Sequence, residues 1–89
     1  MEIPVPDDLA TICREIAAEG KTDDEWAQIE AGDWFQTETV TGGYDAGERA
    51  FTFSFYAPED EELWIVLTLA EAAEVARGER TVVEARRPD

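Results

Sequence analysis

Residues 51–56 read FTFSFY, and this stretch decides the fold. Large aromatic and small polar side chains alternate in it with a period of two, which is the period of a β-strand with one buried face. The pattern predicts a strand that turns Phe51, Phe53 and Phe55 toward a core. The neighbouring segments then predict the rest of the fold.

The segments on either side predict the adjoining strands. Residues 34–41 (WFQTETVT) are rich in strand formers, and residues 42–47 (GGYDAG) have the composition of a turn. Downstream, an acidic turn at 59–62 (EDEE) leads into 63–69, an apolar run typical of a central strand or one covered on both faces. These three strands predict an antiparallel meander, and residues 81–85 (TVVEA) suggest a short fourth strand at a sheet edge.

A helix is predicted before the strands. Apolar side chains recur at positions 9, 12, 13, 16 and 17, which is one stripe of a helix of about three turns. Asp7 and Asp8 are expected to cap its start and to place negative charge in its first turn. Gly20 is expected to end it, because glycine readily adopts the left-handed backbone that follows many helices.

Two further helices are predicted by the capping-box pattern, in which Ser or Thr is followed three residues later by Glu or Gln. TDDE at 22–25 predicts a short helix up to about Glu30, and TLAE at 68–71 predicts one that stops at Gly78. The order of elements is therefore α-α-β-β-β-α, with an optional final β.

This order predicts an α+β two-layer sandwich, with helices on one face of an antiparallel β-meander of three or four strands. The chain has 89 residues, and we expect residues 1–89 to form a single domain. Residues 1–6 and 86–89 are expected to be extended or frayed. Because so small a domain has a thin core, each of its three tryptophans is first of all a core candidate.

Charge is the feature most informative about partners. The chain has 22 acidic and 7 basic residues, a formal net charge of −15. Such a field repels nucleic acid and anionic lipid and attracts cationic surfaces. We therefore expect a basic protein partner, such as a toxin domain, and neither nucleic acid nor a membrane as partner. Nothing in the sequence indicates an oligomeric state.

Few residue types in the chain can carry catalysis. There is no histidine, and Cys13 is the only cysteine, which excludes histidine-based triads, cysteine metal clusters and internal disulfides. Residues 41–44 lack the spacing and the lysine of a phosphate-binding loop, and the acidic runs lack the spacing of a calcium-binding loop. We expect no catalytic residue, no metal site and no cofactor. A cytoplasmic location is expected, since the N-terminus shows no signal-peptide pattern.

Several aromatic side chains stand next to acidic ones, a combination suited to binding a basic groove. Consecutive hairpin turns lie at opposite ends of a meander, so acids from the two turns need not share one patch. The predicted partner-binding residues are Asp33, Trp34, Tyr44, Asp45, Glu48, Tyr56, Glu59, Asp60, Glu61 and Glu62.

Small size, acidity and the lack of catalytic groups favour a non-catalytic inhibitor of the immunity-protein or antitoxin type, which covers a basic site of a partner such as a toxin nuclease. Two alternatives stand beside it. In the first alternative, the chain is an acidic cytoplasmic domain of unknown role, whose charge serves solubility or adaptation to high salt. In the second, it is a DNA mimic, which needs its carboxylates in a row along one elongated face.

Overall fold

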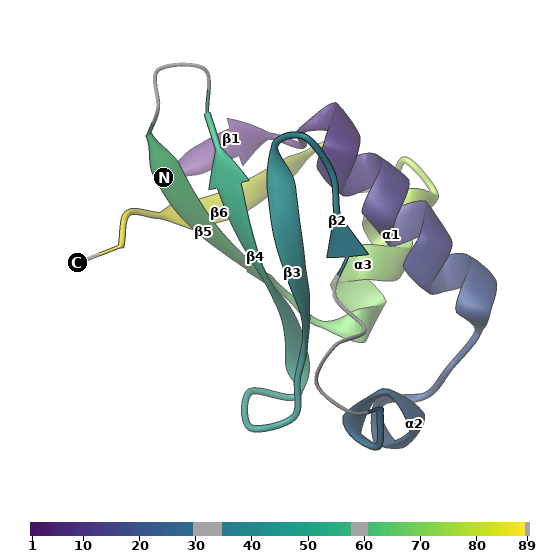
Figure 1. Ribbon diagram of the computed structural model, residues 1–89. Helices are drawn as coiled ribbons and strands as arrows, with labels where there is room; N and C mark the ends of the chain where they lie inside the picture. Colours follow the sequence, from purple (N-terminus) through teal and green to yellow (C-terminus); the bar gives the residue numbers. More distant parts are fainter. Residues whose placement is uncertain (30–34, 58–60, 89) are drawn as a thin grey trace.

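The chain folds into a six-stranded sheet with helices on one face (Figure 1). The computed structural model describes residues 1–29, 35–57 and 61–88. Within these ranges the helices and strands are β1 (Glu2–Pro4), α1 (Asp7–Glu19), α2 (Asp23–Ala27), β2 (Phe35–Gln36), β3 (Val40–Asp45), β4 (Ala50–Tyr56), β5 (Glu62–Leu67), α3 (Leu69–Ala76) and β6 (Val82–Arg86). The predicted two-layer α+β fold is confirmed.

The sheet has the strand order β1-β6-β5-β4-β3-β2, and its neighbouring strands are antiparallel. The predicted meander forms its middle as β3, β4 and β5. The prediction of three or four strands was too low, because β1 and β2 are only three and two residues long. Segments so short show too few alternations to be recognised as strands in the sequence.

β4 carries the alternation of residues 51–56 into the core, as predicted. Phe51 is fully buried and Phe53 is almost so, whereas Tyr56 on the opposite face is exposed. The Phe51 ring meets the rings of Trp26 and Tyr44 edge-on, with 5.1 Å between centroids in both pairs. Edge-to-face pairs at this spacing are favourable beyond the apolar area they bury. Phe51 therefore joins α2, β3 and β4 in one aromatic cluster.

α1 lies on the sheet with its apolar stripe inward and ends at Gly20, where φ is +64°. The expectation that Asp7 and Asp8 cap its start was wrong, since the N-cap residue is Pro6 and both acids lie in the first turn. Asp8 instead links the helix to the chain before β3. Its carboxylate Oδ2 accepts hydrogen bonds from the hydroxyl and the N–H of Thr39, at 2.6 and 3.3 Å.

Both predicted capping boxes are present. In α2 the hydroxyl of Thr22 accepts from the N–H of Glu25, while the Glu25 carboxylate accepts from the N–H of Thr22. Thr68 and Glu71 make the same reciprocal pair at the start of α3. α2 is shorter than expected and ends at Ala27, whereas the predicted end at Glu30 lies outside the described residues.

The predicted position of the first turn was wrong. Residues 42–45 belong to β3, and the turn to β4 lies at 46–49. Gly42 is needed within the strand because it stands opposite Phe53, where a Cβ atom would lie 2.0 Å from the Thr52 carbonyl oxygen and 2.8 Å from Phe53. Glycine here permits a close approach of two backbones and does not mark a turn.

Residues 63–69 were expected to form a central strand or one covered on both faces, and the first alternative is confirmed, because β5 lies between β6 and β4. β5 is covered on one face only, with Trp64 and Val66 exposed between buried neighbours. The expectation of an edge strand at 81–85 was wrong. β6 is not an edge strand, because β1 pairs with its outer side. Glu2–Pro4 lie within the N-terminal segment and Arg86 begins the C-terminal segment, both of which we expected to be extended or frayed; Glu2–Pro4 form β1, and Arg86 is the last residue of β6.

Replacing Gly42 with alanine is expected to lower the free energy of unfolding by about 3 kcal/mol, because the new methyl group meets backbone atoms that cannot turn aside. Urea unfolding measures the loss. The control is Gly20→Ala, where nothing lies within 4 Å of the new Cβ atom and only the left-handed φ is unfavourable. This control is expected to lose about 1 kcal/mol. Equal losses in the two variants would contradict the close approach.

The link between Asp8 and Thr39 is expected to make stability depend on pH. The hydroxyl of Thr39 holds the pKa of Asp8 below its ordinary value of 3.8. A carboxylate whose pKa is lowered by folding stabilises the fold fully above its ordinary pKa, and this contribution is lost as the pH falls through the lowered value. Asp8→Asn is therefore expected to be less stable than the wild type near neutral pH and to approach it at acid pH.

The measurement is the difference in unfolding free energy between Asp8→Asn and the wild type along a pH series. Asp7→Asn is the matched control, because Asp7 lies in the same helical turn and its carboxylate accepts no hydrogen bond from a described residue. A difference for Asp8→Asn that stays constant from neutral to acid pH would rule out this link.

Candidate binding face of the sheet

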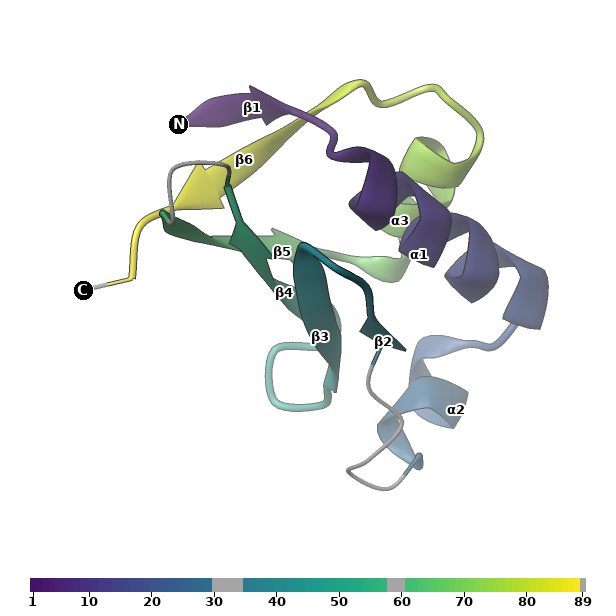
Figure 2. The same ribbon diagram turned by 45° about the horizontal axis from the view of Figure 1, so that its top comes forward.

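The face of the sheet opposite α1 and α3, which we call the open face, has no described helix on it (Figure 2). Strand register decides which side chains lie on it, because residues directly opposite each other share a face. One row crosses four strands through Thr41, Ser54, Trp64 and Arg86. By the same alternation the open face carries Thr41, Asp45, Thr52, Ser54, Tyr56, Glu62, Trp64, Val66, Val82, Glu84 and Arg86.

This face exposes most of the apolar surface that the core leaves out. Five large apolar side chains of the described residues are exposed, and all but Met1 lie on it: Tyr56 (48 %), Trp64 (44 %), Val66 (39 %) and Val82 (43 %). A small domain needs its large apolar residues for the core. Apolar groups gathered on one face and rimmed by polar residues are typical of a contact surface.

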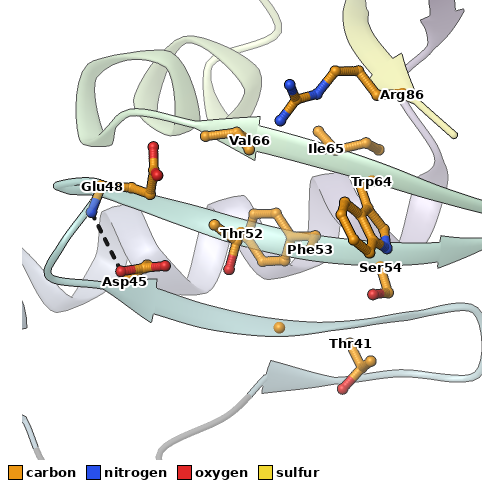
Figure 3. Close-up of a pocket in the computed structure, with 11 residues that line it drawn as sticks. Thr41, Asp45, Glu48, Thr52, Phe53, Ser54, Trp64, Ile65, Val66 and Arg86 are labelled. Carbon is orange, nitrogen blue, oxygen red and sulfur yellow. Dashed lines mark hydrogen bonds between the residues drawn. The ribbon is translucent and has the colours of Figure 1, made fainter. Parts of the chain in front are cut away.

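The open face contains a hollow of about 380 Å³. Figure 3 shows Asp45 and Glu48 at one end of it, Trp64 and Ser54 toward the other, and Thr52 between them, with Arg86 reaching from the β6 side over Ile65. Its lining is Thr41, Gly42, Asp45, Glu48, Thr52, Phe53, Ser54, Trp64, Ile65, Val66 and Arg86. Negative groups thus stand at one end of the depression, and a positive group stands at its β6 side.

The carboxylate of Asp45 is held in place by the turn that follows β3. Its Oδ1 accepts from the N–H groups of Gly47 and Glu48, at 2.9 and 3.3 Å. These bonds hold the carboxylate at the end of the hollow where Figure 3 shows it. Glu48 is exposed and forms no ion pair with a described residue.

The predicted partner-binding residues separate into two groups, as expected for consecutive turns. Asp45 and Glu48 lie at the turn between β3 and β4, whereas Tyr56, Glu61 and Glu62 lie where β4 ends and β5 begins. The Glu61 carboxylate pairs with Arg87 at 2.7 Å. The remaining predicted residues Asp33, Trp34, Glu59 and Asp60 lie outside the described residues.

Tyr44 lies on the side of the sheet that faces the helices. Its ring contacts Phe51, and its hydroxyl donates to the Asp23 carboxylate at 2.9 Å. Burial and this carboxylate raise the pKa of Tyr44, so the hydroxyl keeps its proton and its place in the bond. Tyr44 thus connects β3 to the start of α2 and lies apart from Tyr56.

Sequence reasoning did not include Trp64, Val66 or Arg86 among the site residues. Trp64 and Val66 lie in an almost wholly apolar run, in which no polar residue marks the exposed face. The only signal was the alternation along the strand: if Leu63, Ile65 and Leu67 point into the core, the residues between them point outward. Arg86 directly follows the strand predicted at 81–85, and that segment is too short for the sequence to show which of its residues share a face.

Three further properties of the described residues bear on what the site can do. Burial raises the pKa of the Cys13 thiol to about 11, so it is not a thiolate nucleophile at neutral pH. Within residues 1–29, 35–57 and 61–88 no three His, Cys, Asp or Glu side chains are grouped so as to hold a metal ion. In the same ranges no helix has the length and apolar character needed to cross a membrane.

Comparisons of the chain with known protein families, with curated proteins and with solved structures gave no match. The candidate site therefore depends on its geometry alone. That geometry is an open sheet face with exposed aromatic and aliphatic groups, a hollow, and charged groups of opposite sign in different parts of its lining.

Substituting the tryptophans separates a contact residue from a core residue. Trp26 is 4 % exposed within the aromatic cluster, and Trp26→Ala is expected to lower the free energy of unfolding by about 3–5 kcal/mol. Trp64→Ala is expected to lower it by about 1 kcal/mol, the range of strand preference at an exposed position. Chemical denaturation of both variants measures this, and a loss for Trp64→Ala as large as that for Trp26→Ala would make Trp64 a structural residue.

Proposed function

We propose that this protein is a small acidic binding protein that acts without catalysis and covers a basic site of a partner protein with its open face. The observation that carries the proposal is the exposure of Trp64, Tyr56, Val66 and Val82 on one face of a protein with a net charge of −15. Tryptophan and tyrosine are the side chains that most often dominate binding energy at protein interfaces.

Charge supports a basic partner over an acidic one or a second copy of this chain. Two surfaces of this protein brought face to face would each carry a share of the net charge of −15 and repel one another. Most basic side chains are already engaged, as in the pairs Lys21–Glu19 and Arg77–Glu79. The surplus of carboxylates therefore stays available to attract a cationic surface and speed its association.

The class of protein that combines these features is an inhibitor of the immunity-protein or antitoxin type, acting in the cytoplasm. Its target would be a basic active site, such as that of a toxin nuclease, whose nucleic-acid substrate an acidic surface displaces. The indole of Trp64 and the ring of Tyr56 would supply contact area, and acids such as Glu48 and Glu62 the steering field.

A second candidate is supported by a different observation. Carboxylates lie on the helices as well as on the sheet, for example Asp7 and Glu15 on α1. This distribution suits charge that serves solubility or adaptation to high salt. A DNA mimic is less favoured, because on the open face a row of hydroxyl and apolar groups separates Asp45 from Glu62 and Glu84.

The two candidates are separated by a pair of double variants that each remove two negative charges. Glu48→Gln with Glu62→Gln changes the open face, and Asp7→Asn with Glu15→Gln changes α1. With a basic partner purified from the native host, the first pair is expected to lower the association rate about tenfold at low salt, because it weakens steering. The second pair is expected to change it little, and added salt is expected to remove the difference.

Surface plasmon resonance at two ionic strengths measures these rates. Trp64→Ala is measured alongside and is expected to speed dissociation, since it removes contact area and no charge. Equal effects of the two double variants, with no effect of Trp64→Ala, would assign the charge to solubility and remove the open face from the interface.

A further inference from the structure

The hollow on the open face has a polarity that a purely acidic binding surface does not need. We propose, on the basis of the function proposed above, that it takes an extended segment of the partner with a basic side chain at one end and a carboxylate about six residues away. The basic side chain lies against Asp45 and Glu48, and the partner's carboxylate binds Arg86. The net charge attracts the partner, and Arg86 sets the register in which it binds.

The acidic end is built to receive a guanidinium or ammonium group. The two N–H groups that bind Oδ1 of Asp45 fix its carboxylate, and Oδ2 makes no hydrogen bond to a described residue. Glu48, in the same turn, adds a second carboxylate to this end of the hollow. A planar guanidinium has enough donors to bind both.

Arg86 marks the β6 side of the hollow. Five of the seven basic side chains form ion pairs with described acids, and Arg14 donates to Thr11. Arg86 forms no ion pair and no hydrogen bond with a described residue, and it is exposed beside Trp64 in the register of β5 and β6. A guanidinium that has no ion pair within the described part of the chain is placed to bind a carboxylate, which it can do with two parallel hydrogen bonds.

The floor of the hollow suits an extended main chain. Thr52 and Ser54 are half-buried there, and their hydroxyls make no hydrogen bond to a described residue. A hydroxyl both donates and accepts, so these two can serve the N–H and C=O groups of a bound segment. Val66 and Trp64 provide apolar contact beside them.

Strand register gives the spacing. Asp45 stands in the row of Ala50, and Arg86 stands in the row of Ser54. These rows are separated by four residues of β4, or about 14 Å at 3.4 Å per residue. Asp45 is on β3 and Arg86 is on β6, three strands away, which adds about 14 Å across the sheet at about 4.8 Å per strand. An extended segment that crosses the sheet obliquely between them spans about 20 Å, or about six residues, and its side chains at positions i and i+6 face the same way.

Three short blocked peptides of Thr, Val and Ser test the proposal. The first carries Arg at position i and Glu at i+6; the second moves the Glu to i+5, which turns it to the other side of an extended chain; the third replaces the Glu with Gln. We expect the first peptide to bind about threefold more tightly than either of the others, the size of an exposed charge pair. Attraction by net charge alone predicts the reverse, because the third peptide is the most cationic.

Calorimetry or NMR titration of the wild type and two variants gives the result. Arg86→Gln is expected to remove the advantage of the first peptide, and the matched control Arg77→Gln, which lies beyond the end of α3, is expected to keep it. Tightest binding of the third peptide, equal binding of the first two, or no binding of any peptide would overturn the proposal. None of those results would overturn the proposed function, which is tested separately by the association rates of the double variants.

Discussion

The close approach of β3 and β4 at Gly42 is the constraint on which the rest of the structure depends. The Thr52 carbonyl and Phe53 occupy the space where any other residue would carry its side chain. This contact fixes the face of every residue in β3, because side chains alternate along a strand. Val40 is thereby placed in the core, and Asp45 is placed on the open face at the end of the hollow.

The elements with strong local chemistry could be predicted from the sequence. The alternation at 51–56, the stripe of α1 and the two capping boxes each depend on contacts within a few residues, and all are present. The first turn was misplaced because glycine serves two purposes, and only the tertiary contact with Phe53 shows which applies at Gly42. The pairing of β1 with β6 could not be predicted, since it joins the two ends of the described chain.

For the candidate site, the composition predicted the kind of partner, whereas the pairing of strands that are distant in the sequence determined where on the fold the site lies. The net charge of −15 is a property of the sequence, as is the nearness of Asp45 and Glu48 in one turn. The neighbourhood of Trp64 and Arg86 depends on β6 lying beside β5, and no local pattern encodes this. Tyr44 is the opposite case. It stands next to an acid in the sequence, which predicted a contact residue, but its ring packs against Phe51 and its hydroxyl donates to Asp23.

The pairing of β1 with β6 also bears on how the chain reaches its folded state. The amino group of Met1 binds Glu84, 83 residues away, whereas β3, β4 and β5 are joined by short connections. Closing so long a loop has an entropic cost that must be met before its contacts are gained, and such contacts slow folding. Chain entropy therefore favours early formation of the β3–β5 hairpins. β6 can pair with β5 over the 22 residues that separate Trp64 from Arg86, whereas β1 joins the outer side of β6 only when both ends of the chain come together.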